Sequence, residues 1–340
     1  MAENVFDVFN GDAFSMVALT DYVNRQPFVP HQMGDLNLFR ASGIQTTSVE
    51  IDVYDGNLAL IPSQPRGGPS NQNKHNKRSA KIIKVPHLPL KDRISADEAR
   101  NVRAYGSVNL LQSAQDVVNQ RLDEMLPKHD ATREFQMIRA VQGTIVDADG
   151  STVLLDIYNT FGVSQTTVDF DLGTAGTDQI SKCETVLNDM EDALGSMTFD
   201  GVFAFCGRTW FQKFVSHPKV VDAYKYFQAT GQNLNPLRDD TRYKGFQFGG
   251  IIFKVYRGQV GGIPFVAASE AYAFPLSPML FRTYYAPSDS WEDINTVGLP
   301  RYAKTYMEDN SGRAMVVDTE SNPISVPLRP EANIKLTTST

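Results

Sequence analysis

The residues best suited to catalysis or metal binding stand singly along this 340-residue sequence. None of its five histidines has a histidine or cysteine three or four residues away, the spacing that zinc sites on helices use. Ser216 and His217 are adjacent, but adjacency does not give a nucleophile and its base the required geometry. The sequence therefore predicts no metal site. The histidines are His31, His75, His87, His129 and His217.

Pairs of neighbouring carboxylates could supply a general acid and a general base. They lie in polar stretches, which favour solvated loops over an active site. Glycine patterns for phosphate or dinucleotide binding are absent, and so is Gly-x-Ser-x-Gly. We therefore expect no catalytic residue and no cofactor. The pairs are Asp239–Asp240, Glu292–Asp293 and Glu308–Asp309.

Two cysteines, Cys183 and Cys206, are too few for a disulfide framework. Two reduced core thiols are favoured over a redox pair, because Cys183 falls on an apolar helical stripe. The N-terminus lacks the basic and apolar regions of a secretory signal. No apolar run approaches the roughly 18 residues of a membrane span. We expect synthesis in the cytoplasm and no membrane partner.

The formal charge of −7 is unevenly distributed. Residues 56–91 carry seven cations and no carboxylate, so the rest of the chain carries −14. This basic segment could be a solvated loop, could dock on an acidic neighbouring copy, or could bind nucleic acid. Its tip has no aromatic residue for base stacking, which places nucleic acid behind the docking interpretation. The cations proposed to anchor the tip are Arg66, Lys74, Lys77, Arg78 and Lys81.

The basic segment belongs to a predicted two-stranded ribbon. Residues 48–61 alternate apolar and polar side chains, residues 63–79 hold no core-forming apolar residue, and residues 80–85 are again typical of a strand. An isolated ribbon is marginally stable. Residues 1–47 also lack a core of their own, although 12–25 could form one amphipathic helix. We expect both segments to lie across something else.

A long helix and a second core are predicted next. Ser95 and Glu98 form a capping box, and apolar helical spacing runs from 110 to 141, as one helix kinked at Pro127 or two in line. A hairpin over 144–157, a helix over 178–194 and a buried strand over 202–206 follow. The helix has Gly195 as its stop and an apolar stripe of Ile180, Cys183, Leu187, Met190 and Leu194. Further helices are expected over 210–215 and 220–227, with strands over 245–256 and 263–267. Residues 199–306 hold 23 of the 35 aromatic residues, which indicates a separate core.

The C-terminal third contains a recognisable string. Phe281-Arg-Thr-Tyr-Tyr-Ala-Pro-Ser-Asp289 precedes Glu292-Asp-Ile-Asn-Thr296 and Gly298-Leu-Pro-Arg-Tyr-Ala-Lys304. Weaker matches lie upstream in the same order, including Ala131-Thr-Arg-Glu134. The sequence resembles the major capsid protein (protein E) family of lambda-type tailed bacteriophages over nearly its whole length. The motif residues are Tyr285, Ala286, Pro287, Asp289, Asn295, Thr296, Pro300, Tyr302, Ala303, Lys304, Asn322 and Pro323.

This resemblance implies an α+β chain with the fold of tailed-phage major capsid proteins. Its parts would be an N-terminal arm (1–47), an extended E-loop (48–92), a P-domain with a long spine helix (93–158), an A-domain (159–275) and C-terminal P-domain strands (276–340) that return beside the spine helix. The resemblance further implies hexamers and pentamers closing an icosahedral shell around double-stranded DNA. The shell would be assembled in the host cytoplasm and would expand as DNA enters.

The same resemblance implies scaffold, portal and decoration proteins as separate chains, with no sequence-specific DNA contact. Lys74, Lys77 and nearby asparagines could form the Lys–Asn bonds of some relatives of the fold, but the family points to a decoration protein instead. Two other hypotheses remain at this point. One is the shell subunit of an encapsulin-like nanocompartment, and the other is a soluble α+β enzyme.

Overall fold

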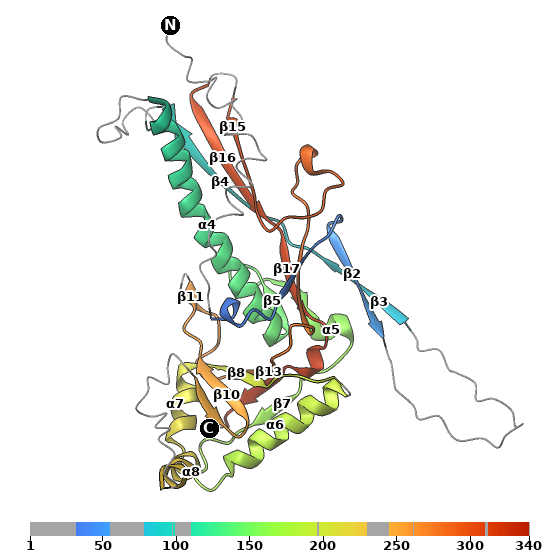
Figure 1. Ribbon diagram of the computed structural model, residues 1–340, viewed down its shortest axis with the longest axis vertical. Coiled ribbons are helices and arrows are strands. Elements are labelled where there is room, and N and C mark those ends of the chain that lie inside the picture. The colour runs from blue at the N-terminus through green and yellow to red at the C-terminus, as the bar shows by residue number, and fades with distance from the viewer. Residues whose placement is uncertain are drawn as a thin grey trace, which may run out of the picture.

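The computed structural model describes residues 32–54, 78–96, 98, 110–195, 197–229, 245–260, 262–309 and 312–339. Within these ranges the molecule is elongated (Figure 1). A six-stranded sheet with its helices forms one end, and a three-stranded sheet beside a long helix forms the other. A two-stranded ribbon leaves the side of the molecule between them. The mixture of helix and sheet confirms the predicted α+β class.

The long helix, α4 (Leu110–Gln142), runs for 33 residues and passes through Pro127 without a break. At 1.5 Å per residue it extends about 50 Å. The structure therefore shows one helix where the sequence left two possibilities open. The helix ends at Gly143, whose positive φ of 93° suits glycine. A Cβ there would lie 1.9 Å from the Tyr158 ring, so the stop also needs a residue without a side chain.

The N-terminal half of α4 packs against an antiparallel sheet. Its strands are β4 (Leu88–Ser95), β15 (Tyr302–Met307) and β16 (Ala314–Ser321), in the order β15-β16-β4. Period-2 alternation in these strands turns apolar side chains toward the helix. The predicted N-cap contact before the helix is present, because Ser95 Oγ accepts a hydrogen bond from the Glu98 N–H at 3.2 Å. The buried cluster includes Ile94, Met315, Val317, Val118, Leu122 and Met125.

The six-stranded sheet has the order β7-β18-β13-β8-β10-β9. Its strands are β7 (Thr167–Asp169), β8 (Val202–Cys206), β9 (Phe246–Phe248), β10 (Ile251–Val255), β13 (Ala271–Pro275) and β18 (Ile334–Thr337). The expected single strand over 245–256 was wrong: Gly249 and Gly250, both at positive φ, turn it into a hairpin. The last strand, β18, pairs with β13 and β7, so it lies in this sheet rather than beside α4.

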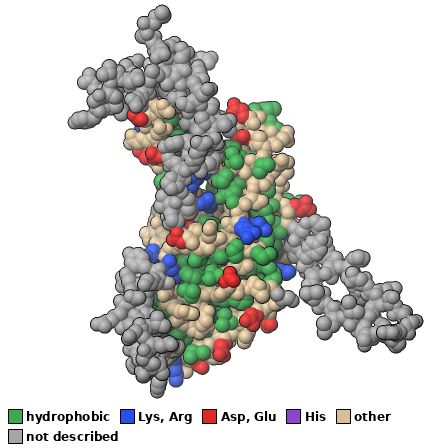
Figure 2. All heavy atoms as spheres, viewed as in Figure 1, with side chains coloured by type: hydrophobic (Ala, Val, Ile, Leu, Met, Phe, Trp, Pro, Cys, Tyr) green, Lys and Arg blue, Asp and Glu red, His purple; other side chains and the backbone are tan. Residues whose placement is uncertain are grey.

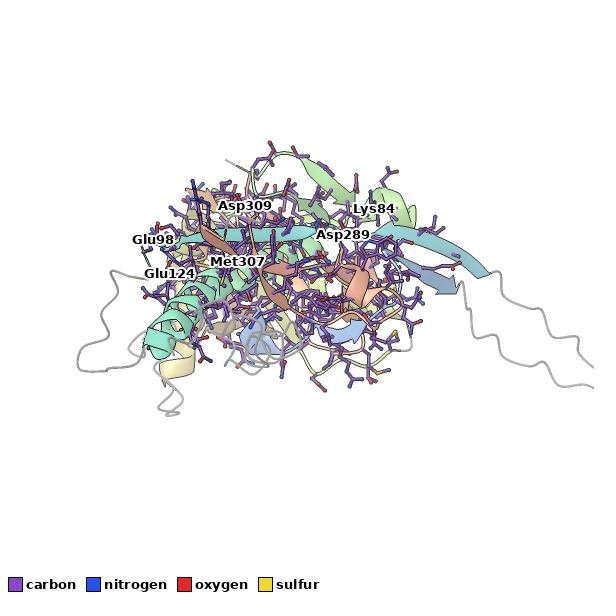
Figure 3. All side chains as sticks on the ribbon, turned by 90° about the horizontal axis from the view of Figure 1, so that it is seen from above. Lys84, Glu98, Glu124, Asp289, Met307 and Asp309 are labelled. Atoms are coloured by element: carbon purple, nitrogen blue, oxygen red, sulfur yellow. The ribbon has the colours of Figure 1, made fainter. Side chains whose placement is uncertain are left out.

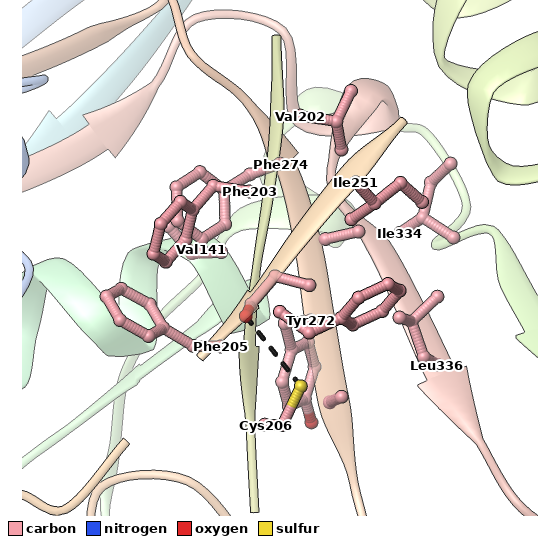
Figure 4. Packing of buried hydrophobic residues seen from close by; sticks show 14 of the residues in the cluster. Val141, Val202, Phe203, Phe205, Cys206, Ile251, Tyr272, Phe274, Ile334 and Leu336 are labelled. Atoms are coloured by element: carbon pink, nitrogen blue, oxygen red, sulfur yellow. Dashed lines mark hydrogen bonds between the residues drawn. The ribbon is translucent and has the colours of Figure 1, made fainter. Parts of the chain in front are cut away.

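Aromatic side chains fill the core on both faces of this sheet. Phe203, Phe205 and Phe274 lie on the side of Val141 from α4 (Figure 4). On the other side, Trp210 of α7 (Arg208–Ser216) stacks on Phe253 at 5.8 Å between ring centroids. Helix α8 (Pro218–Ala229) follows α7 directly. These contacts confirm an aromatic-rich core. The prediction that this core is separate from the core of α4 was wrong, because Phe135, Ile138 and Val141 of α4 belong to the same buried cluster.

Helix α6 (Gln179–Leu194) begins and ends as expected, with Asp178 as N-cap and Gly195 as its stop. Its buried face contains Cys183, Val186, Met190 and Leu194. The prediction that Ile180 belongs to this face was wrong, because its side chain is 46% exposed. Figure 2 shows acidic side chains near this end of the molecule. Cys183 and Cys206 are buried free thiols, and burial raises the pKa of Cys183 to about 12.

The predicted ribbon is present as β2 (Ser48–Tyr54) paired with β3 (Arg78–Lys84). Its base is buried with Ile145 and Ile324, through Val49, Ile51 and Ile83. Beside it, β1 (Arg40–Gly43), β14 (Phe281–Tyr285) and β17 (Pro323–Pro327) form a sheet. The predicted hairpin is β5 (Thr144–Val146) with β6 (Val153–Asp156), followed by α5 (Ile157–Phe161). The remaining elements are η2 (Gly34–Leu36), η3 (Trp291–Asp293), η4 (Pro330–Ala332), β11 (Gln259–Val260) and β12 (Ile263–Pro264).

The end of the predicted N-terminal arm packs within its own subunit. Met33 and Leu38 are buried in the large core, and Leu36 and Phe39 are partly buried against it. Residues 33–43, which were expected to lie across another surface, therefore pack on the body of their own subunit, and β1 pairs there with β14. Residues 1–31, and with them the predicted helix over 12–25, lie outside the described residues.

Two substitutions on α6 test its orientation. Met190→Ala removes a fully buried side chain and is expected to cost about 2–5 kcal/mol of unfolding free energy. Ile180→Ala changes an exposed position and is expected to stay within about 0.5 kcal/mol of the parent. Urea unfolding of the purified subunit measures both. Equal losses would contradict the face assignment.

Candidate assembly site

The predicted motif residues meet at the turn between β16 and β17. Asn322 is buried there, and its Nδ2 donates to the Pro287 carbonyl at 2.9 Å. Its Oδ1 accepts from the Leu88 N–H at 3.2 Å, and its carbonyl accepts from the Ala286 N–H at 3.0 Å. One side chain thus joins the end of β14, the start of β4 and the β16–β17 turn. Pro323 pairs with Tyr285 in the adjoining sheet.

Other motif residues support the same junction. Tyr302 accepts a hydrogen bond on its hydroxyl from the Leu299 N–H at 2.8 Å, and the Pro300 carbonyl accepts from Ser321 Oγ at 2.8 Å. Beside Asn322, Glu320 Oε1 accepts from the Asp289 N–H at 3.0 Å. Ala303 of β15 is buried. Lys304, the next residue of this strand, is half-buried and pairs with Asp318 of β16. The motif therefore fixes the connection between the β1-β14-β17 sheet and the β15-β16-β4 sheet.

The loop over 287–300 exposes several large apolar side chains. Trp291 is 90% exposed, and Ile294, Val297 and Leu299 are each more than 40% exposed. The loop has a fixed base, because the Gly298 N–H donates to the Ile44 carbonyl at 2.9 Å. Motif residues Asn295, at a φ of 65°, and Thr296 shape this loop. Clustered exposed apolar side chains of this kind mark interaction surfaces.

The predicted tip cations are only partly placed. Lys81 lies in β3 opposite Ile51, and Arg78 begins the same strand. Arg66, Lys74 and Lys77 lie outside the described residues. At the root of the ribbon, Lys84 and Ile82 are exposed, Ile82 by 71%. The ribbon therefore leaves the body with charged and apolar side chains exposed, including Glu50 of β2 opposite Ile82.

An excess of carboxylates lies at the far end of the long helix. Arg121 is shared among Asp92, Glu98 and Glu124, at 3.5, 3.7 and 3.5 Å. Glu308 pairs with Arg93 at 2.6 Å, and Asp309 is exposed next to it. Figure 3 shows Glu98, Glu124 and Asp309 on the opposite side of the molecule from Lys84. The basic and acidic parts of one subunit therefore point away from each other.

A buried carboxylate on α4 joins the other parts of the body to this helix. Glu134 is fully buried. Its Oε1 accepts from the Met33 N–H and the Tyr256 hydroxyl, each at 2.7 Å, and its Oε2 accepts from the Gly34 N–H at 3.1 Å. Burial, followed by the Glu134 charge, raises the pKa of Tyr256, so that its hydroxyl remains a donor. Three chain segments meet at one side chain.

A second polar contact lies one turn earlier on α4. Asp130 pairs with Arg301, and both side chains are buried. Next to them, His129 Nε2 lies 3.0 Å from Thr319 Oγ1. Burial, and then the positive charge of Arg301, lowers the pKa of His129 from 6.5 to about 4. Sequence reasoning assigned these residues no role, although Glu134 and Arg301 lie within the matched strings.

Several residues considered above for catalysis make structural hydrogen bonds or ion pairs instead. His217 Nε2 contacts the Thr174 carbonyl at 3.0 Å, whereas Ser216 Oγ donates to the Lys213 carbonyl, so the two do not form a pair. Glu308 binds Arg93, and Asp293 accepts from Ser288. Asp239 and Asp240 lie outside the described residues. Within the described ranges, no cluster of three metal-ligating side chains occurs, and no helix is long and apolar enough to cross a membrane.

Solved structures share this arrangement of elements at low sequence identity. A candidate capsid protein of an Escherichia coli CFT073 prophage has a TM-score of 0.57 and 14% identity, covering 100% of both chains. The mature capsid of bacteriophage PhiM1 has a TM-score of 0.50 and 16% sequence identity, and the match covers 89% of this chain and 85% of the other. The capsid of Myoviridae phage XM1 has a TM-score of 0.50 and 12% sequence identity, and the match covers 92% of this chain and 94% of the other. The fold is that of tailed-phage capsid subunits.

The family itself follows from sequence. The family model for phage major capsid protein E matches residues 15–338, and the chain belongs to this family. The major capsid protein of Pseudomonas phage KPP10 is 31% identical over 93% of this chain and 95% of its own length. The major capsid protein of Salmonella phage Felix O1 is 27% identical over 92% of this chain and 93% of its own length. The protein is a shell-forming capsid protein.

Glu134 offers a test of the buried junction. Glu134→Gln replaces an acceptor by a donor that faces a backbone N–H, which should cost about 1–3 kcal/mol of unfolding free energy. Tyr256→Phe removes one of the three donors and is expected to cost less. Urea unfolding of the purified subunit compares the two. A larger loss in Tyr256→Phe would contradict the assigned role of Glu134.

His129 predicts a pH dependence. The unfolded chain binds a proton at His129 below pH 6.5, whereas the folded chain resists it down to about pH 4. The folded state therefore loses up to about 3 kcal/mol from this group as the pH falls through that window.

His129→Gln keeps a polar side chain near Thr319 and removes this titration. Urea unfolding at pH 7.5 and pH 4.5 should show a smaller acid loss for the variant than for the parent. An identical acid loss in both proteins would refute the role given to His129.

Proposed function

We propose that this capsid protein assembles into hexamers and pentamers, which close an icosahedral shell around double-stranded DNA. The single observation that carries the contact between copies is the placement of charge. The cationic ribbon root and the carboxylate-rich end lie on opposite sides of the subunit (Figure 3). A heterologous, head-to-tail contact between such surfaces generates rings when its rotation closes.

The ribbon segment is the donor in the proposed contact. Residues 56–84 carry six cations and no carboxylate, and their tip would lie over the end containing Glu98, Glu124 and Asp309 of a neighbouring copy. Opposite potentials speed encounter and fix the register of such a contact. The apolar loop around Trp291 would add buried area, since large exposed apolar groups cost free energy in an isolated subunit.

The expected division into arm, E-loop, P-domain and A-domain remains part of this proposal. By sheet membership, residues 334–337 go with the A-domain strands. The virion capsid is the location of the protein, and assembly in the host cytoplasm is proposed with it. Scaffold, portal and decoration proteins are proposed as separate chains, and no covalent Lys–Asn bond between subunits is proposed. The family membership favours this function over a nanocompartment or an enzyme.

Neutralising the tip tests the contact. Replacing Arg66, Lys74, Lys77, Arg78 and Lys81 by Gln should sharply reduce the yield of closed particles seen by electron microscopy. A matched variant neutralises exposed Arg208 and Lys219, which lie on α7 and α8, and should assemble normally.

The acidic end provides the complementary variant. Glu98→Gln, Glu124→Gln and Asp309→Asn together should reproduce the assembly defect of the tip variant. Because exposed charges are screened by salt, both defects should be larger at low ionic strength than at high ionic strength, whereas the variant at Arg208 and Lys219 should assemble normally at both. Unchanged particle yield after tip neutralisation would contradict the proposed contact.

A further inference from the structure

An apolar groove crosses the middle of α4. It has a volume of about 310 Å³, and its walls come from α4, the tip of the β5–β6 hairpin and the β11–β12 hairpin. Phe135 and Phe265 form its buried floor, with ring centroids 4.9 Å apart. At the rim Val260 is 53% exposed. The lining is almost entirely apolar, which leaves a hydrophobic surface without a partner among the described residues.

The walls of this groove are held in place by hydrogen bonds. Gln142 Nε2 at the end of α4 donates to the Phe265 carbonyl at 2.7 Å. The Phe265 N–H donates to the Gly258 carbonyl at 3.0 Å across the β11–β12 hairpin. Just before that hairpin, the Tyr256 hydroxyl is bound to Glu134 of α4. The groove is therefore formed before anything occupies it.

The described chain begins beside the same hairpin. Gln32 Oε1 accepts from the Arg257 N–H at 2.9 Å, and Gln32 Nε2 donates to the Val255 carbonyl at 3.2 Å. These two bonds tie the exit of residues 1–31 to the base of one groove wall. Six residues, 26–31, separate Gln32 from the predicted amphipathic helix over 12–25, and an extended run of that length reaches up to about 20 Å.

We propose that residues 12–25 of the same chain occupy this groove as a helix. Their apolar face, with Phe14, Ala18 and Tyr22, matches the apolar lining. The segment carries Asp12, Asp21 and Arg25, a net charge of −1, and Lys128 is exposed at the rim, so the charges are compatible. Docking would cover Val260 and place the N-terminal segment across α4 beside Pro127.

Cross-linking in the full-length chain tests this placement. Cys183 and Cys206 are fully buried, so introduced cysteines should react selectively with a short bismaleimide. Ala18→Cys is paired with Val260→Cys. The control pairs Val23→Cys with Val260→Cys: Val23 is nearer the tether, but a helix turns it about 140° from Ala18.

The products are separated on a denaturing gel after assembly. The Ala18 pair should give at least about tenfold more intramolecular product than the Val23 pair, since a tethered segment has a high effective concentration at its site. Tyr22→Cys with Thr132→Cys, on the α4 wall, repeats the test should the first pair fail to fold, with the same expectation.

Three outcomes would overturn the proposal. They are equal product from both pairs, no product from either test pair, and a dimer in place of the intramolecular product, which would assign the groove to a neighbouring copy. Electron microscopy of the same samples reports assembly independently. Closed particles without the cross-link would therefore refute the docking of residues 12–25 and leave the proposed function intact.

Discussion

Helix α4 contributes buried side chains to each of the three hydrophobic clusters found among the described residues. Val118 and Leu122 serve the distal sheet, Ile138 and Val141 serve the six-stranded sheet, and Ala140 serves the base of the ribbon. Because protein cores are close-packed, a shift of this helix would disturb all three clusters together. Two buried contacts fix the rotation of the helix. Glu134 accepts hydrogen bonds from Met33 and Tyr256, and Asp130 pairs with Arg301. The distal sheet, the six-stranded sheet and the base of the ribbon all pack against this helix.

A shell subunit must be rigid inside and incomplete at its edges. The Asn322 junction satisfies the first need, since one amide joins three stretches of backbone where the family motif lies. The ribbon, the Trp291 loop and the carboxylate-rich end satisfy the second, because each presents charge or apolar surface that its own subunit leaves uncovered. Their separation on the molecule directs these surfaces toward other copies. The groove on α4 differs from these surfaces, because the described part of the chain begins beside it at Gln32.

Local patterns in the sequence were sufficient for elements that bury one face. The spacing from Val117 to Val141 predicted α4, and Asp178 and Gly195 bounded α6. The aromatic density predicted an aromatic-rich core, but not that the C-terminal half of α4 is part of it. Pattern failed where a backbone turn or a distant contact decides. The Gly249–Gly250 turn splits a continuous apolar run, and Ile180 fits the helical period yet faces solvent. Met33 and Leu38 are irregularly spaced and are buried through contacts with distant parts of the chain. Glu134 was matched by resemblance, but its three donors come from residues at least 100 positions away in the sequence.

The central claim is that opposite ends of neighbouring subunits meet through opposite charge. Cryo-electron microscopy of assembled particles tests it most directly, by tracing residues 55–77 of one subunit to their contacts. The account predicts that Arg66, Lys74 and Lys77 lie within ion-pairing distance of the end containing Glu98, Glu124 and Asp309 of an adjacent subunit. Cations of this segment ordered against another surface, or facing solvent throughout the shell, would contradict it.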